Sequence, residues 1–212
     1  MKRPNLLADE DLPPAPRQKR SLDKRARLKL AGLALFGEKG YEATSINEIA
    51  GRAELAVGGF YQHFRSKRQL LLVLMDELLE GLSHLHLFPR AWVDIQLGLR
   101  GLLADAFSRD LKYLGAYRAW QEAILSDPEL ARKDAEIHVW TTARVTSLFL
   151  MLDQIGRVRP DVNIPALGRV MDGFFWSLLG RAVLMPRREL DEWVDMSAYL
   201  IFHAMFVDSS GE

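Results

Sequence analysis

The sequence predicts an all-α protein of about nine helices, in which a small N-terminal group precedes a larger helical remainder. Apolar residues recur at spacings of three and four along nearly the whole chain, as on one face of a helix. No segment shows the convincing alternation of a β-strand. Glycines and prolines divide the pattern into separate helices, for example at Gly40, Pro89, Pro128 and Pro186.

The composition is that of an ordinary soluble protein with one strongly basic segment. Of the 212 residues, 49% are hydrophobic and 26% are charged, and the formal net charge is zero. Residues 17–68 nevertheless hold 12 Lys and Arg against 5 Asp and Glu, a net charge of +7, whereas residues 69–212 hold 14 against 20. A basic segment of this kind attracts a polyanion.

No pattern in the sequence predicts export or insertion into a membrane. The absence of cysteine excludes disulfides and thiolate metal sites. The first 20 residues contain four prolines and lack the apolar core of a signal peptide. The longest uncharged apolar runs are far shorter than the roughly 18 residues that a membrane span needs. We therefore expect a cytoplasmic protein with no membrane partner.

Residues 1–20 are predicted to be a disordered tail that ends in the basic run Arg17-Gln18-Lys19-Arg20. This run could follow the DNA backbone or minor groove, or be a solvated leader. A helix is then expected from Ser21 to about Gly37, with a left-handed stop at Gly40. Its predicted apolar stripe consists of Leu22, Ala26, Leu30, Leu33, Ala34 and Phe36.

Residues 44–64 have the outline of a helix-turn-helix. Ser45 followed by Glu48 is the capping-box pattern, and it predicts a helix over residues 46–53. A second short helix is expected to place Phe60 and Phe64 on one apolar face. Two short helices joined by a turn of three or four residues form the motif whose second helix enters the DNA major groove.

The rest of the chain is predicted to consist of longer helices. Ser66 with Gln69 forms a second capping box, which opens a helix through Leu82. Further helices are expected over 92–107, 111–125 and from Pro128 through residue 152, where proline suits the first turn. The last two helices span 164–185 and the residues after Pro186.

The last two helices are predicted to be a dimerisation unit, because the first of them is apolar nearly all round. The alternative is that they complete the core of a monomer. The residues expected at the dimer interface are Phe174, Phe175, Leu178, Ala182, Trp193, Leu200, Ile201 and Ala204.

Several of these residues together resemble the TetR family of one-component transcriptional regulators. The resemblance covers about residues 21–79 closely. It is carried by Ala34, Phe36, Gly40-Tyr41, Thr44-Ser45, Ile49-Ala50, Gly58, Phe60-Tyr61, His63-Phe64, Ser66-Lys67 and Leu70-Leu71. It implies a helix-turn-helix DNA-binding domain over 21–66, and a ligand-binding and dimerisation domain over 67–208.

The resemblance also implies a function. The protein would be a homodimeric regulator, a repressor in the family's usual mode, that binds a palindromic double-stranded DNA operator and is released by a small-molecule effector. Thr44, Ser45, Tyr61, His63 and Lys67 would contact phosphates. The residues implied to face the bases are Val57, Gly58, Gly59 and Gln62, with Asn47 as a further candidate.

The chain departs from the family pattern before the second short helix. It has Glu54-Leu55-Ala56-Val57 where many members have Gly-Val-Ser-Lys. Ala56 cannot cap a helix as Ser does, at a cost of about 1 kcal/mol. We therefore expect Gln62, methyl contacts and DNA shape to share the reading of sequence.

An effector cavity is expected among the helices between about residues 71 and 184. Its possible walls are aromatic: Trp92, Phe107, Tyr117, Trp120, Trp140, Phe149 and Trp176. Each of these could instead be ordinary core. Asp105, Asp172 and Arg181 could orient a polar group of the ligand, pair across the dimer, or be exposed. An apolar lining favours a hydrophobic or amphipathic effector.

No enzymatic motif is present: the sequence has no HExxH, nucleophile elbow, phosphate-binding loop or cysteine nucleophile. His84 and His86 are the nearest approach to a metal pair, and neither a metal nor a cofactor is expected. The alternative to a DNA-binding regulator is a helical interaction protein whose basic N-terminal end binds a protein or a membrane.

Overall fold

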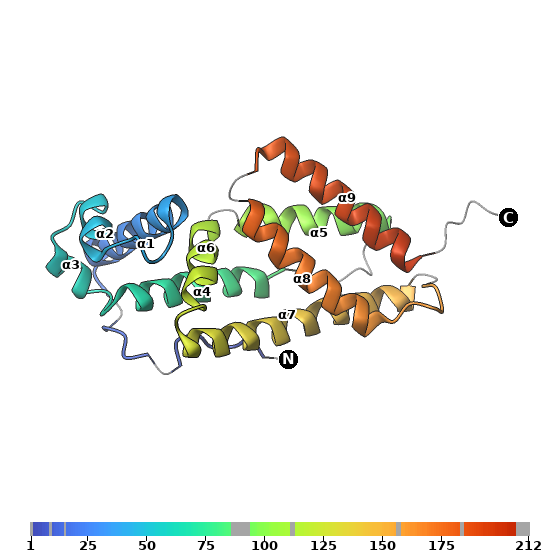
Figure 1. The fold of residues 1–212 in the computed structure, drawn as a ribbon, viewed down its shortest axis with the longest axis horizontal. Coiled ribbons are helices and arrows are strands. Elements are labelled where there is room, and N and C mark those ends of the chain that lie inside the picture. Colours follow the sequence, from blue (N-terminus) through green and yellow to red (C-terminus); the bar gives the residue numbers. More distant parts are fainter. Residues whose placement is uncertain are drawn as a thin grey trace. The chain divides into compact units, whose positions relative to one another are not determined.

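The computed structural model describes residues 2–8, 10–14, 16–85, 94–110, 113–155, 158–182 and 185–206, with the backbone alone at 108–110 and 155. Over these ranges the chain forms nine α-helices and no strand, which confirms the predicted all-α class (Figure 1). The helices are α1 (Lys19–Lys39), α2 (Ile46–Arg52), α3 (Val57–Tyr61), α4 (Lys67–Ser83), α5 (Ile95–Asp110), α6 (Leu114–Ala123), α7 (Pro128–Ile155), α8 (Ile164–Ala182) and α9 (Arg187–Met205).

The chain groups into two compact units. The head unit consists of residues 4–81 and 112–135, and the cavity unit consists of residues 1–3, 82–111 and 136–212. Helices α4 and α7 each contribute residues to both. This grouping differs from the predicted domain boundary at residues 66–67, which stays a prediction.

In the head unit, the buried stripe of α1 shares only Phe36 with the one predicted. Its buried residues are Leu28, Ala31, Gly32, Leu35 and Phe36. Leu22 and Leu30 of the predicted stripe are 50% and 66% exposed. Both stripes have helical spacing, and neighbouring helices decide between them. A side chain at Gly32 would meet Leu70 of α4, and one at Gly115 of α6 would meet the backbone of Leu33.

The link between α1 and α2 turns at Gly40, as predicted. Gly40 has φ = 84°, a left-handed conformation that favours glycine, and its N–H donates to the carbonyl of Phe36. The backbone N–H groups of Tyr41 and Glu42 donate to the Glu122 carboxylate at 2.6 and 3.1 Å. Glu122 of α6 therefore satisfies two backbone donors of a link 80 residues earlier in the chain.

In the cavity unit, α5, α7, α8 and α9 share an apolar core. Its buried members are Leu99, Leu148, Phe149, Leu152, Ile164, Ala198, Ile201, Met205 and Phe206. A single antiparallel bridge joins Val158 to Phe206. None of the helices over the described ranges has the length and apolar character needed to cross a membrane.

Candidate functional site

The helix-turn-helix is built from α2 and α3, and α2 opens with the predicted capping box. The N–H of Glu48 donates to Ser45 Oγ at 3.3 Å, and the N–H of Ser45 donates to the Glu48 carboxylate at 2.9 Å. Hydrogen bonds from Lys39 and then from Ser45 lower the pKa of Glu48 to about 2. The start of α2 is thus fixed by local hydrogen bonds that the sequence alone predicts.

The turn between the two helices passes through Glu54. With φ = 54°, it is the one non-glycine residue with positive φ over the described ranges. This conformation costs roughly 1–2 kcal/mol in a residue with a Cβ atom. The N–H of the following Leu55 donates to the carbonyl of Ala50 at 2.9 Å, and Arg27 donates to the Glu54 carboxylate at 3.0 Å. These contacts hold the turn in place.

Helix α3 is anchored on one side and exposed on the other. Phe60 is completely buried, with its ring centre 5.7 Å from that of Phe64. Tyr61 is 51% exposed and Val57 is 37% exposed. Gly58, Gln62, Ser45 and Asn47 are also exposed, and Gly59 is half-buried. No side chain caps the N-terminus of α3, as expected from Ala56. The structure therefore presents most of the predicted base-facing stretch to solvent.

Two predicted phosphate contacts are buried instead. Thr44 is 2% exposed, and its hydroxyl donates to the carbonyl of Gly40 at 2.7 Å. His63 is 3% exposed, and its buried Nε2 has no partner among the described residues. Burial, and then the nearby charges of Arg25 and Lys24, lower the pKa of His63. Neither side chain presents a surface donor, which corrects the roles expected for them.

Lys67 is half-buried against Tyr41. Its ammonium donates to the carbonyl of Tyr41 at 2.7 Å and lies 4.2 Å from the centre of the Tyr41 ring. Burial lowers the pKa of Lys67, and burial also raises the pKa of Tyr41 to about 12. Lys67 therefore ties the first turn of α4 to the link after α1, and its contact with phosphate stays a prediction.

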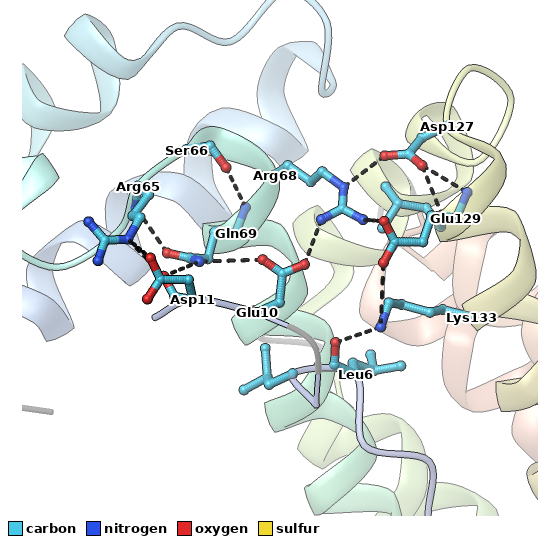
Figure 2. Close-up of polar contacts among 12 residues, drawn as sticks. Leu6, Glu10, Asp11, Arg65, Ser66, Arg68, Gln69, Asp127, Glu129 and Lys133 are labelled. Carbon is cyan, nitrogen blue, oxygen red and sulfur yellow. Dashed lines mark hydrogen bonds and ion pairs between the residues drawn. The ribbon is translucent and has the colours of Figure 1, made fainter. Parts of the chain in front are cut away.

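An N-terminal strap, residues 4–8 and 10–14, packs on the head unit where the sequence predicted a disordered tail (Figure 2). Leu6 is completely buried, and its carbonyl accepts a hydrogen bond from Lys133 at 3.1 Å. Asp11 lies 2.9 Å from Arg65, the residue that follows Phe64. The apolar contact of one leucine could not be recognised among the prolines and charges around it.

Arg68 is the centre of the polar contacts in Figure 2. Its guanidinium lies 2.6 Å from Glu10, 2.8 Å from Asp127 and 2.7 Å from Glu129. Burial lowers the pKa of Arg68, but the hydrogen bonds to Asp127 and Glu10 outweigh it and raise this pKa above its ordinary value. Asp127 also accepts hydrogen bonds from the N–H groups of Glu129 and Leu130, which caps α7.

The cavity unit contains a partly open cavity of about 120 Å³. Three aromatic residues predicted as walls line it: Phe107, Trp140 and Phe149. Tyr117 and Trp120 are buried in the head unit and do not line it, which corrects their predicted role. Trp176 is buried and donates to Thr141 at 3.3 Å without lining the cavity, and Trp92 lies outside the described residues.

The lining is apolar apart from a few polar side chains, of which Arg144 and Asp172 are charged. The guanidinium Nη2 of Arg144 donates to the backbone carbonyls of Leu82 and Leu85. Burial lowers the pKa of Arg144. Arg144 was not among the predicted cavity residues, although its place between the apolar residues Trp140 and Leu148 on one helix was a signal. Of the other polar candidates, Asp105 and Arg181 are exposed.

The predicted dimer residues on α8 and α9 divide into two groups. Leu178, Ala182 and Ile201 are buried, with 2%, 5% and 7% of their surface exposed, so little of each side chain is available to a partner, and their interface role stays a prediction. Phe174, Phe175 and Trp193 are half-buried, and Phe174 stacks on Trp193. Leu200 and Ala204 are exposed. The other large apolar residues exposed on these helices are Val170, Met196 and Tyr199.

Within the described ranges, no three His, Asp or Glu side chains lie together as a metal site would require. His84 is described, whereas His86 of the predicted pair lies outside the described residues.

The chain matches the family model described as bacterial regulatory proteins of the tetR family, over residues 30–74. It is 60% identical over 37 residues to the transposon Tn10 TetC protein of Escherichia coli. This segment is 18% of this chain and 19% of that protein. It is 27% identical over 134 residues to the HTH-type transcriptional activator FasR of Mycolicibacterium smegmatis, 62% of this chain and 60% of that protein. The chain thus spans less than two thirds of each of these relatives.

Solved structures agree with the fold over nearly the whole chain. A gamma-butyrolactone receptor, described as an ArpA-like protein, superposes with a TM-score of 0.68 over 90% of this chain and 92% of that one, at 18% identity. The matched family consists of regulators, which confirms the prediction that the chain is not an enzyme. The chain thus carries a tetR-type helix-turn-helix segment over residues 30–74, and its fold is that of solved TetR-family structures.

Proposed function

We propose that this protein is a ligand-responsive transcriptional repressor that binds a palindromic operator as a homodimer and is released by a small hydrophobic or amphipathic effector. The exposed face of α3 carries this proposal. A buried Phe60 fixes the helix, while Val57, Gly58, Tyr61 and Gln62 are exposed. A short helix held by one buried aromatic ring and exposed on its other side is suited to lie in a major groove.

The side chains of α3 suggest how it would read DNA. Gln62 can pair bidentately with adenine, and Val57 can contact a thymine methyl group, each discriminating by about 1–3 kcal/mol at best. The adjacent Gly58 and Gly59 let the backbone approach the bases. We assign a phosphate contact to the Tyr61 hydroxyl, which fixes register without reading sequence.

With Thr44 and His63 buried, other groups must contact phosphate. We assign this role to Ser45, as a hydrogen-bond donor, and to the cations Lys67 and Arg65. Arg65 is 55% exposed and follows the helix-turn-helix directly. Its partner Asp11 would have to yield to a phosphate, and an exposed pair of this kind is weak enough to do so.

Repression is the sign that we propose. The HTH-type transcriptional repressor KstR, to which the chain is similar over short segments, carries that sign in its name, whereas FasR is named as an activator. A reporter gene placed behind the recovered operator would be silenced by the protein if it is a repressor. Higher expression with the protein present would reverse this assignment.

We propose that the dimer forms through the exposed apolar face of α8 and α9. Val170, Met196 and Leu200 are 62%, 56% and 53% exposed. A side chain at Gly173 would meet no atom within 4 Å, so a helix can approach there closely. The mass in solution should be that of a dimer. Leu200→Asp should give a monomer, whereas Leu97→Asp, at a 64% exposed position on α5, should not.

The effector is proposed to occupy the cavity of the cavity unit. Its apolar lining supports a hydrophobic or amphipathic ligand. Leu82, near the C-terminal end of α4, belongs to that lining, and α4 begins at Lys67 directly after the helix-turn-helix. We propose that ligand binding shifts α4 and thereby separates the two reading heads of the dimer.

Selection of bound fragments from a random DNA pool tests the proposal. We expect the recovered fragments to share two inverted half-sites. Their affinity, measured by fluorescence anisotropy, should fall steeply as salt rises, because phosphate contacts release counterions. Recovery of no enriched sequence, together with an affinity that salt does not change, would contradict a DNA-binding function.

A further inference from the structure

The inference concerns the chemical class of the effector and rests on the proposed function. The cavity lies wholly within the cavity unit and has 20 lining residues, mostly Leu, Phe and other apolar types. Two of the 20 are charged, Arg144 and Asp172. A charge in an apolar cavity is costly unless it is paired, so the partners of these two residues indicate what the cavity is suited to hold.

Asp172 has a partner in its own subunit. It is 3% exposed, and its Oδ2 lies 3.0 Å from Nδ1 of His138. The edge of the His138 ring faces Trp176, with ring centres 5.6 Å apart. The other carboxylate oxygen, Oδ1, is buried and accepts no hydrogen bond from the described residues. Asp172 thus has a hydrogen-bonding partner in His138, with one acceptor to spare.

Arg144 has no ionic partner among the described residues. Its Nη2 donates to the carbonyls of Leu82 and Leu85 at 3.2 and 3.3 Å, and its guanidinium lies 5.2 Å from the centre of the Trp140 ring. Over the described ranges it forms no ion pair, whereas Arg100 and Arg159 each bind an aspartate. Arg144 is half-buried, and neutral carbonyls and an aromatic ring stabilise a half-buried cation less than a carboxylate does. A guanidinium can bind a carboxylate through two parallel hydrogen bonds.

The size of the cavity limits the apolar part of the ligand. Its volume is about 120 Å³. An engineered cavity of about 150 Å³ in another protein binds benzene, so this one suits a single ring or a short chain. A large polycyclic or long-chain body would extend beyond this volume.

We propose that the cavity binds a monocarboxylate with a compact apolar body of roughly six to eight carbon atoms. The carboxylate pairs with Arg144, and the apolar body lies against Phe107, Leu148 and Phe149. A hydroxyl on the body can donate to Oδ1 of Asp172. The ligand therefore supplies the negative charge that the subunit does not place beside Arg144.

Three unbranched ligands of eight carbon atoms each, which differ in the head group, test this. Binding of octanoate, octan-1-ol and octylamine to the full-length protein is measured by calorimetry without DNA. We expect octanoate to bind at least about tenfold more tightly than octanol, and octylamine to bind most weakly. Equal affinities, a preference for the amine, or no binding of octanoate would overturn the proposal.

Variants at Arg144 separate the pairing from a general effect on the cavity. Arg144→Gln should reduce octanoate affinity to that of octanol and leave octanol unchanged, while Arg144→Lys should keep part of the preference. Arg100→Gln removes an arginine that already pairs with Asp195 and should change nothing. If Arg144→Gln does not fold, the wild-type head-group series still decides, together with Arg144→Lys. An octanoate preference that survives Arg144→Gln would overturn the pairing.

Failure of the carboxylate proposal can be distinguished from failure of the proposed function. The calorimetric series contains no DNA, and the operator selection contains no octanoate. Loss of DNA binding would leave the head-group series intact. Lack of octanoate binding would leave the operator selection intact.

Discussion

The Lys67 ammonium donates a hydrogen bond to the Tyr41 carbonyl at 2.7 Å and lies 4.2 Å from the centre of the Tyr41 ring. Two residues 26 positions apart are therefore joined where the helix-turn-helix meets α4. The contact gives Lys67 a structural role in addition to the phosphate contact that the family resemblance implies. A substitution there should change stability as well as DNA affinity.

Lys67→Met keeps the apolar stem and removes the charge. We expect the free energy of unfolding to fall by about 1–2 kcal/mol, because a charge-assisted hydrogen bond and a cation–π contact are both lost. Urea denaturation measures this. Lys19→Met, at an exposed first residue of α1, is the control and should change stability by less than about 0.5 kcal/mol. Equal stability of the two variants would mean that the Tyr41 contact contributes nothing.

Gly115 is predicted to be intolerant of any side chain. A Cβ atom there would lie 2.0 Å from the Leu33 carbonyl oxygen and 2.9 Å from the Gly37 nitrogen, both rigid backbone atoms of α1. Gly115→Ala should lower the free energy of unfolding by about 2 kcal/mol or more, and the melting temperature should fall with it. A Cβ atom at Gly101, in α5, would meet no atom within 4 Å. Gly101→Ala should therefore raise the free energy of unfolding by about 0.5–1 kcal/mol. Similar melting temperatures for both variants would show that α1 and α6 do not pack this closely.

His63 should make stability depend on pH. Burial, and then Arg25 and Lys24, lower its pKa in the folded protein below the ordinary value of 6.5, so the unfolded chain takes up a proton first as pH falls. The contribution of His63 to the free energy of unfolding is at its maximum above about pH 6.5. It decreases as pH drops from there toward the folded pKa, by at most about 1.4 kcal/mol per pH unit. His63→Gln removes this titration. Urea denaturation between pH 7.5 and 5.5 should give a flatter curve for the variant, and parallel curves would exclude His63 as the cause.

The N-terminal strap should stabilise the head unit. Leu6→Ala removes a completely buried side chain, with an expected loss of about 2–3 kcal/mol in the free energy of unfolding. Arg68→Met leaves Glu10, Asp127 and Glu129 without their shared cation, and should cost about 2 kcal/mol. Arg188→Met, which removes an exposed pair with Glu192, should cost less than about 0.5 kcal/mol. Wild-type stability in a chain lacking residues 1–14 would show that the strap does not stabilise the head unit.

Two residues of α3 should affect DNA binding in different ways. Gln62→Ala should lower the affinity for the selected operator by about 1–3 kcal/mol and relax the preference at one base position. Tyr61→Ala should weaken binding to all sequences alike, because a phosphate contact carries no sequence information. Gln121→Ala, at an exposed position on α6, is the control for Gln62. Anisotropy titrations on matched and mismatched operators separate these outcomes, and unchanged affinity of both α3 variants would remove α3 from the interface.

Local chemistry allowed much of the fold to be predicted from the sequence. The capping box of Ser45 and Glu48, the left-handed Gly40 and the first-turn Pro128 each act within a few residues, and the helices begin or end where these residues place them. The helix-turn-helix was recognisable for the same reason, since its spacing lies within about two dozen consecutive residues.

Contacts between distant residues decided the remainder. Two stripes of α1 have helical spacing, and only the packing of Gly32 and Gly115 against their neighbours selects the buried one. Thr44 and His63 have polar side chains, which suggested surface donors, but the surrounding core buries them. Leu6 lies in a proline-rich charged segment, and its burial depends on residues such as Lys133, which is 127 positions away. Among the described residues Arg144 has no ionic partner, because α4, α7 and α8 bring mainly apolar side chains to the cavity, and spacing along α7 alone cannot predict which residues of other helices surround it.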